Sequence, residues 1–328
     1  LYASTTNGAQ NNTILNNTID LNRTYQNTFG IYSNSVHSGT TVTTAATATG
    51  ANGGNHNLKI YGNTITDVNI GIVYVGPTAA ADHNTGLDIG GTALATGNTI
   101  TNFGTTGTFS GYSNVSGSVN GILVRNTKNF NISYNNVASS NGGVTAGTLR
   151  GIFVPAFNNA PTGVIVNTIN NNTVSLRSAA AGGTMFGISN EATTVSATTT
   201  LNINNNDFNT FGHTVAGTAA ITLIINAATT LNTNINNNTF TNLSVNTTAG
   251  FTFISNNVTH PTDAVTIVNN NAIVTGFSKT GAGGTVYFYD SFGSTTSGSE
   301  TNTGNNFSNV TLTGATTLGG FRSADGGT

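Results

Sequence analysis

One short motif recurs along the whole chain and constrains the fold more than any other feature. It consists of an apolar residue, two polar or small residues, Asn, any residue, and then Ile, Val or Phe. Nine copies place the Asn at Asn17, Asn63, Asn98, Asn135, Asn172, Asn206, Asn238, Asn271 and Asn305, and only the last copy has a polar residue, Asn302, at the leading position. The apolar residues that close the copies are separated by 46, 35, 37, 37, 34, 32, 33 and 34 residues. Such a period predicts a protein built from stacked structural repeats.

Each period holds three short β-forming segments. One precedes the Asn, one follows it, and the third is an apolar run that usually begins with Gly, as in Gly151-Ile-Phe-Val154. We align the later copies of this run at Ala220-Ile221, Gly250-Phe251 and Thr285-Val286, and we take Ala95 as the leading apolar residue of the third motif. No segment shows helical periodicity. We therefore predict an all-β fold, a single-stranded right-handed parallel β-helix of about nine coils with three short strands per coil.

The constant position of the Asn suggests a structural role. At a tight bend between strands the backbone needs a left-handed residue, which Asn tolerates better than other non-glycine residues, so we expect the motif Asn to adopt that conformation. Neighbouring coils lie about 4.8 Å apart, and side-chain amides at that spacing can donate to and accept from one another. The nine Asn residues are thus predicted to form a ladder at one turn.

Composition narrows the function classes. The chain has 8 Lys and Arg and 10 Asp and Glu, so charged residues make up 5% where about 25% is usual. The net charge of −2 predicts neither a nucleic-acid partner nor binding to an anionic membrane. Cys is absent, which excludes disulfides and thiolate sites. No apolar run approaches the roughly 18 residues of a membrane span.

We expect one β-helix domain over residues 1–328, with surface loop excursions at 39–57 and 104–119. The chain opens at Leu1 and closes on Gly-Gly-Thr, and we interpret it as a piece of a longer protein. Its partners are then predicted to be neighbouring domains of the same chain or further copies of it, together with cell-surface glycans.

Two strings carry a family resemblance. Ile60-Tyr-Gly-Asn-Thr-Ile65 and Asn120-Gly-Ile-Leu-Val124 resemble the parallel β-helix repeat of pectate-lyase-like proteins. The wealth of Thr and Asn also resembles the large secreted repeat adhesins of gliding or predatory Bacteroidota. This resemblance implies an extracellular location at the cell surface, but the repeat specifies a fold rather than an activity.

Candidate residues for catalysis or metal binding are few. Asp20, Asp67, Asp207 and Asp263 fall in separate coils at different offsets from the Asn column. Asp82, His83 and Asp88 are the only local cluster of titratable groups, and we expect hydrogen bonds within a turn there, with a metal site on Asp82 and Asp88 as the weaker alternative. Arg125 and Lys128 are interpreted as solvated surface charges. The remaining histidines are predicted to lie in surface loops: His37, His56, His213 and His260.

Three functions are compatible with these observations. We favour a non-catalytic structural or adhesive module of a surface appendage, without a cofactor or metal, because titratable groups are scarce and the repeat is uninterrupted. A carbohydrate-binding or polysaccharide-degrading β-helix is the first alternative, with a site at Asp82 to Asp88 or at Arg125 and Lys128. The second is ice binding, which needs Thr-x-Thr at one offset in every coil. Thr-x-Thr around residues 41, 47, 198 and 311 shows no shared register.

Overall fold

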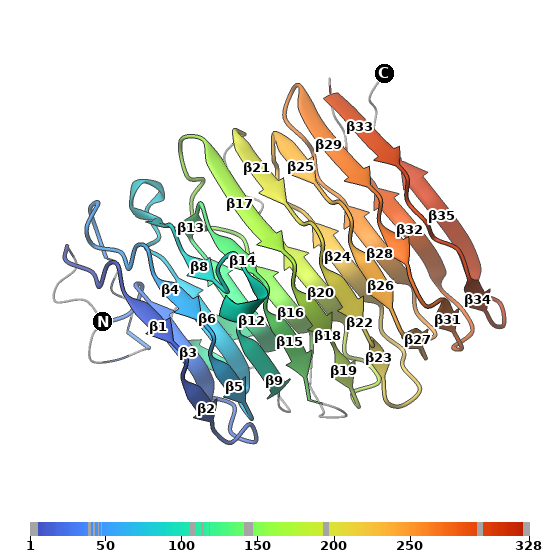
Figure 1. The fold of residues 1–328 in the computed structure, drawn as a ribbon, viewed down its shortest axis with the longest axis horizontal. Helices are drawn as coiled ribbons and strands as arrows, with labels where there is room; N and C mark the ends of the chain where they lie inside the picture. The colour runs from blue at the N-terminus through green and yellow to red at the C-terminus, as the bar shows by residue number, and fades with distance from the viewer. Residues whose placement is uncertain are drawn as a thin grey trace.

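Three long parallel sheets run the length of the molecule. The computed structural model describes residues 6–38, 41, 43–44, 46, 48–104, 109–112, 115–117, 119–140, 147–192, 197–293 and 298–323. Within these residues the chain winds from sheet to sheet, and each turn stacks on the one before it, from the blue end to the red end of Figure 1.

Each sheet takes one strand from successive turns. The first sheet consists of β1 (Thr13–Leu15), β4 (Lys59–Tyr61), β8 (Asp88–Ile89), β14 (Asn131–Ser133), β17 (Ile165–Asn170), β21 (Thr199–Asn202), β25 (Asn232–Asn234), β29 (Ala264–Asn269) and β33 (Gly298–Thr303). The second consists of β2 (Thr18–Asp20), β5 (Thr64–Thr66), β9 (Thr99–Phe103), β15 (Asn136–Ser139), β18 (Thr173–Ser175), β22 (Asp207–Asn209), β26 (Thr239–Thr241) and β30 (Ala272–Ile273). The third consists of β3 (Phe29–Asn34), β6 (Ile70–Val75), β12 (Val119–Arg125), β16 (Leu149–Val154), β20 (Met185–Asn190), β24 (Ile221–Asn226), β28 (Phe251–Asn256), β32 (Thr285–Ser291) and β35 (Thr317–Ser323).

Shorter elements connect or flank the long sheets. They are the parallel pairs β7 (Asn84–Thr85) with β13 (Thr127–Lys128) and β19 (Arg177–Ser178) with β23 (Gly212–His213), the three-stranded β27 (Leu243–Val245), β31 (Phe277–Lys279) and β34 (Val310–Leu312), the antiparallel hairpin β10 (Phe109–Tyr112) and β11 (Val115–Gly117), and the one-turn 3-10 helices η1 (Ala80–Asp82) and η2 (Leu94–Thr96).

The strand register confirms the predicted parallel β-helix. Ile14 pairs with Ile60, and Ile60 pairs with Ile89 in the next turn. The first and third sheets each have nine strands among the described residues, in agreement with nine coils. The second sheet has eight, and a parallel bridge from Ala272 to Asn306 joins the ninth coil to it.

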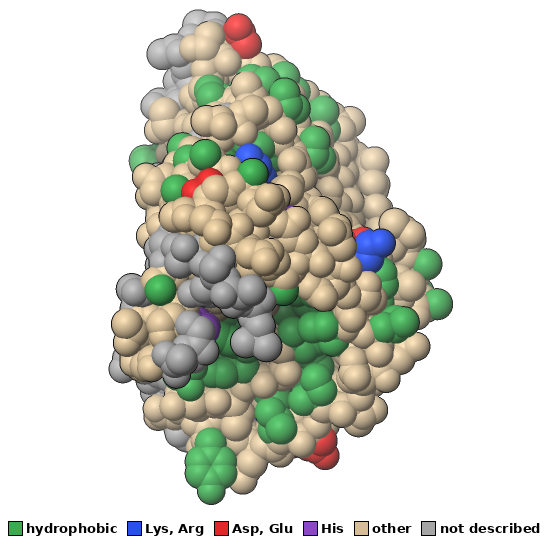
Figure 2. Space-filling model, turned by 90° about the vertical axis from the view of Figure 1, so that its left-hand side faces the viewer, with side chains coloured by type: hydrophobic (Ala, Val, Ile, Leu, Met, Phe, Trp, Pro, Cys, Tyr) green, Lys and Arg blue, Asp and Glu red, His purple; other side chains and the backbone are tan. Residues whose placement is uncertain are grey.

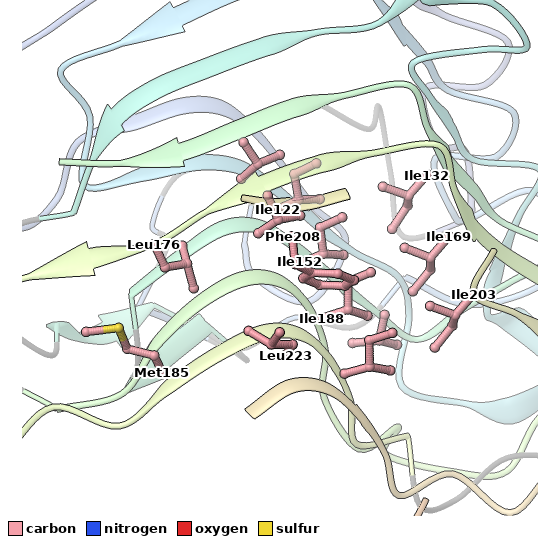
Figure 3. Close-up of a cluster of buried hydrophobic side chains, with 14 of the residues drawn as sticks. Ile122, Ile132, Ile152, Ile169, Leu176, Met185, Ile188, Ile203, Phe208 and Leu223 are labelled. Atoms are coloured by element: carbon pink, nitrogen blue, oxygen red, sulfur yellow. The ribbon is translucent and has the colours of Figure 1, made fainter. Parts of the chain in front are cut away.

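Stacked apolar columns form the core between the sheets. Ile132 and Ile169 lie in register on the first sheet, with Ile203 in the next coil beyond them, and they face the column Ile122, Ile152 and Ile188 of the third sheet (Figure 3). All six side chains are fully buried. Because every coil adds one residue to each column, burial of apolar surface grows in proportion to the number of coils.

The glycine that opens the third-strand run has a packing reason. A Cβ on Gly151 would lie 2.4 Å from Cγ1 of Val174 and 2.6 Å from the carbonyl oxygen of Gly187 in the next coil. In the later coils Leu223 and Phe253 fill this column, because Ile188 pairs with Ile224 and Ile224 with Ile254. The alignment of the later runs on Ile221, Phe251 and Val286 was therefore wrong by three residues, since these residues stack on Met185 instead.

The third coil also departs from the motif as read from the sequence. Its first-sheet strand carries Ile89, which pairs with both Ile60 and Ile132. Ala95 is exposed within η2 and has no place in the core. The interpretation of Ala95 as the leading apolar residue was thus wrong, because a short insertion separates this strand from Asn98.

Val36, just before the first predicted excursion, and Val115, within the second, pack on the outside of the third sheet. Val36 and Val115 are buried there against outward-facing Val73 and Leu123, with Tyr112 at the margin. The second excursion, together with Val36, thus helps to cover a second, smaller apolar cluster on the outer face of a sheet. Residues 39–40, 42, 45, 47, 105–108, 113–114 and 118 lie outside the described residues. Residues 48–57 are described and bond to the end of β3: Ala48 N donates to Ser35 O over 3.1 Å, and Asn55 Nδ2 donates to Ser33 Oγ over 3.0 Å.

Candidate functional site

The Asn ladder is continuous from Asn17 to Asn305. Each side-chain Nδ2 donates to Oδ1 of the Asn in the next coil, over 2.8 to 3.0 Å, in all eight steps. The same Oδ1 accepts a second bond from the backbone N–H of the preceding Asn, as Asn172 Oδ1 does from Asn135 N over 3.0 Å. From Asn63 on, Nδ2 also donates to a first-sheet carbonyl, as Asn172 does to Ile132 O over 2.9 Å. From Asn63 to Asn271 the ladder residues are buried, whereas Asn17 is exposed and Asn305 is partly buried at the two ends. The buried amides are well bonded, as burial of a polar group requires.

In eight of the nine coils the left-handed conformation belongs to the residue before the ladder Asn; the exception is Gly97, with φ of −64°. Asn171, Asn205, Asn237 and Asn270 have φ of 57°, and Tyr134 has φ of 62°. The expectation that the ladder Asn itself is left-handed was therefore wrong. The physical reason is that the residue before it turns the chain, which leaves the ladder side chain aligned with the helix axis.

A second internal ladder was missed in the sequence. Asn190 Nδ2 donates to Asn226 Oδ1 over 2.9 Å, and Asn226 Nδ2 donates to Asn256 Oδ1 over 2.8 Å. All three residues are buried at the ends of third-sheet strands. Beyond them, Asn256 Nδ2 lies 3.1 Å from Nε2 of His260. The recurring Ile-x-Asn of Ile188, Ile224 and Ile254 was the signal that could have identified this ladder.

The sequence cluster of Asp82, His83 and Asp88 is divided by the fold. Asp88 accepts hydrogen bonds from the Tyr61 hydroxyl at 2.5 Å and from Asn131 Nδ2 at 2.7 Å. Asp82 lies in η1, and His83 is buried beside it. Among the described residues no group of three or more His, Asp or Glu side chains is arranged to hold a metal ion.

Buried His56 and His83 lie near the corner formed by β7. The Nδ1 atom of His56 accepts a hydrogen bond from Thr85 N over 3.2 Å. Burial lowers the pKa of His56, and it lowers the pKa of His83 to about 4. Charge repulsion from Lys128 lowers both pKa values further. Both imidazoles are therefore uncharged at neutral pH.

The prediction that the isolated histidines lie at the surface was wrong for three of them. His56, His213 and His260 are only 8%, 6% and 6% exposed. His37 is partly buried and its ring stacks on Tyr32 at 5.7 Å. The residues around these histidines are polar and typical of loops, which is why the sequence indicated a surface position. The stacking of neighbouring coils nevertheless covers the three imidazoles.

Several other charged side chains bond to the neighbouring coil or to a loop of their own coil. Arg125 Nε donates to Ala156 O over 3.1 Å. Asp207 Oδ1 accepts from the hydroxyls of Thr239 and Thr241 over 2.8 and 2.7 Å. Lys279 is fully buried and its Nζ donates to Gly283 O over 2.7 Å, and burial lowers its pKa. Each of these side chains thus bonds to backbone carbonyls or hydroxyls of its own coil or of the next coil.

Two hollows are lined by described residues. One, of about 330 Å³, lies at the end of the molecule that carries β1 and is lined by residues including Ile14, Tyr32 and Leu58. Figure 2 views this end and shows hydrophobic side chains gathered on it. The other, of about 540 Å³, lies beside β27, β31 and β34, and we call it the corner groove. Its polar lining residues are Asn242, Ser244, Thr275, Ser278, Asn309 and Thr311.

Comparisons with known proteins assign no family to the chain. No helix among the described residues is long and apolar enough to span a membrane. The resemblance to pectate-lyase-like proteins is supported only at the level of the parallel β-helix. No protein-family model, curated protein or solved structure gives a significant match to the chain.

Proposed function

We propose that the chain is a non-catalytic structural or adhesive module of an extracellular surface appendage. The observation that carries this proposal is the unbroken Asn ladder through nine coils, with eight side-chain hydrogen bonds parallel to the helix axis. Together, the ladder bonds and the parallel strand pairing resist bending and stretching of the helix. A coil cannot tilt without breaking both kinds of hydrogen bond. A rigid rod is what a shaft that presents binding surfaces away from a cell needs.

The edge of the last described coil favours assembly. β33, β34 and β35 each have a neighbouring strand on one side only, and Leu318 and Phe321 on β35 are each 52% exposed. Unpaired strand edges with apolar side chains are a template for further pairing. We infer that a neighbouring domain of the same chain, or a second copy, covers this edge.

Localisation and adhesion test the proposal directly. Antibodies against the chain should label intact cells as strongly as permeabilised cells, and beads coated with the protein should adhere to host or neighbouring cells more than beads coated with albumin do. Release of reducing ends from neutral and acidic polysaccharides is measured in parallel. Labelling confined to permeabilised cells, or turnover of a polysaccharide, would contradict the proposal.

Ice binding is a second candidate, because the second sheet carries Thr-x-Thr in register. Thr64 and Thr66 of β5 pair with Thr99 and Thr101 of β9, and Thr18 of β2 pairs with Thr64. These Thr residues lie on either side of the apolar position after each ladder Asn, so their common register becomes visible only when the strands are paired. The columns also contain Asp20, Ala138 and Asp207, which interrupt the array of hydroxyls. Thermal hysteresis at millimolar protein decides this candidate, and its absence would remove it.

A further inference from the structure

We propose that the corner groove binds a linear neutral polysaccharide that lies along the helix axis. The inference rests on the proposed adhesive function and names both the surface and the chemistry of what it holds. It is carried by the arrangement of uncharged hydroxyl and amide side chains from three consecutive coils.

The groove arises where each coil bends out of the second sheet. Asn242, Gly276 and Asn309 have φ of 52°, 97° and 58°, so a left-handed residue turns the chain in each of the three coils. The strands β27, β31 and β34 follow these bends and pair in parallel. The left-handed bend leaves a re-entrant corner, and its repetition in three coils extends the corner into a groove.

Its floor is held in place from within. Leu243 and Phe277 are each 2% exposed and point into the core. Lys279, at the end of β31, donates to the carbonyl oxygens of Gly281 and Gly283 and thereby holds the loop that leaves this corner. The groove is thus a preformed feature of packed strands, as ligand sites usually are.

Polar groups repeat along the groove at the spacing of the coils. Ser244 pairs in register with Ser278, and Ser278 with Thr311. Coils are about 4.8 Å apart, so a ligand that follows the axis meets a hydroxyl at each step. Ser278 Oγ donates to Ser244 Oγ over 3.0 Å, and Asn242 N donates to Thr275 Oγ1 over 2.6 Å. These bonds orient the hydroxyls of Ser244 and Thr275. Asn309 and Thr311, in the next coil, are exposed to solvent.

The chemistry of the lining selects the class of ligand. None of the nine lining residues is charged, whereas carboxylates and phosphates are usually bound by Arg or Lys. The exposed side chains are amides and hydroxyls, which both donate and accept hydrogen bonds. A polyhydroxylated, uncharged chain matches this pattern. Its repeating units also match a repeating protein surface, so contacts that are weak one by one add up along the rod.

Binding of defined polysaccharides to the whole chain tests the inference. The probes are soluble laminarin, mannan and xylan as neutral chains and polygalacturonate as the acidic chain, each titrated by calorimetry and by affinity electrophoresis. We expect binding of at least one neutral chain and at least tenfold weaker binding after Ser278→Arg, which fills the groove. Thr311→Arg, at a more exposed position of the groove, should have the same effect, and Ser175→Arg on the second sheet is the matched control.

The outcomes separate this inference from the proposed function. Binding of polygalacturonate alone, binding of none of the probes, or neutral binding that survives both groove substitutions would overturn the groove as a glycan site. Coated beads that adhere to cells equally well with and without Ser278→Arg would also overturn it, while the adhesive function would stand. Loss of neutral binding in both groove variants but not in the control, with beads that do not adhere, would support the groove and contradict the adhesive function.

Discussion

Removal of one ladder amide should destabilise the rod strongly. The Asn172 side chain takes part in four hydrogen bonds with its neighbours: Oδ1 accepts from Asn135 N and Nδ2, and Nδ2 donates to Asn206 Oδ1 and Ile132 O. Asn172→Ala leaves the buried Asn135 N–H without that acceptor, which costs about 1–3 kcal/mol, and it removes three further bonds of roughly 1 kcal/mol each. We expect a loss of about 4 kcal/mol in the free energy of unfolding.

Urea denaturation followed by circular dichroism measures this change, and hydrogen exchange at the Asn135 amide locates it. The matched control is Asn232→Ala, because that half-buried side chain donates one long hydrogen bond of 3.3 Å to Thr200 Oγ1. It should cost less than about 0.5 kcal/mol. If Asn172→Ala lowered the free energy of unfolding no more than the control does, the ladder would not stabilise the rod.

Asn172→Asp, which replaces the amide by a carboxyl group of the same shape, tests the ladder through the pH dependence of stability. Asn172→Asp places a carboxylate oxygen where the amide donated to Asn206 Oδ1 and Ile132 O. Only the protonated acid can donate one of these bonds, so burial and repulsion raise the pKa of the introduced carboxyl in the folded state. The variant is then most stable below its unfolded pKa of about 3.9 and loses stability as pH rises through the folded value. Equal destabilisation at pH 4 and pH 7, relative to the wild type at each pH, would contradict this.

Three further outcomes are expected. Tyr134→Asn should raise the free energy of unfolding by about 1 kcal/mol, because Tyr134 has φ of 62° and Asn tolerates that conformation; a lower melting temperature would refute this. Gly151→Ala should cost about 2–3 kcal/mol, since its Cβ would lie 2.4 Å from Val174, whereas Gly182→Ala, with nothing within 4 Å, should be close to neutral in the same urea titration. Acidification from pH 6.5 to 4 should remove about 3 kcal/mol through His83, whose pKa falls from 6.5 to about 4, because the unfolded chain takes up the proton first; His83→Gln should flatten this pH profile, and an unchanged profile would count against it.

Much of the fold could be read from the residues because a solenoid repeats a local pattern. The offset between Asn135 and Val137, repeated in eight other coils, was sufficient to predict parallel stacking and the ladder. The candidate sites were less predictable. The corner groove combines Ser244, Ser278 and Thr311, which are 34 and 33 residues apart and belong to no motif.

The errors share one physical cause. Asn171 and Asn172 are the same residue type, and only the hydrogen bonds to the adjacent coils decide which one bends the chain and which one joins the ladder. Ile221 and Ile224 are both apolar, and only pairing with Met185 and Ile188 assigns their columns.

What the sequence by itself determined is the period, and with it the number of coils, the parallel pairing and the position of the ladder. The tertiary structure alone decided which side chains the stacking buries, such as His83 and Lys279, and which surfaces it assembles from several coils. The reason is that a coil's own residues set its bends, whereas burial and surface shape depend on coils more than 30 residues away along the chain.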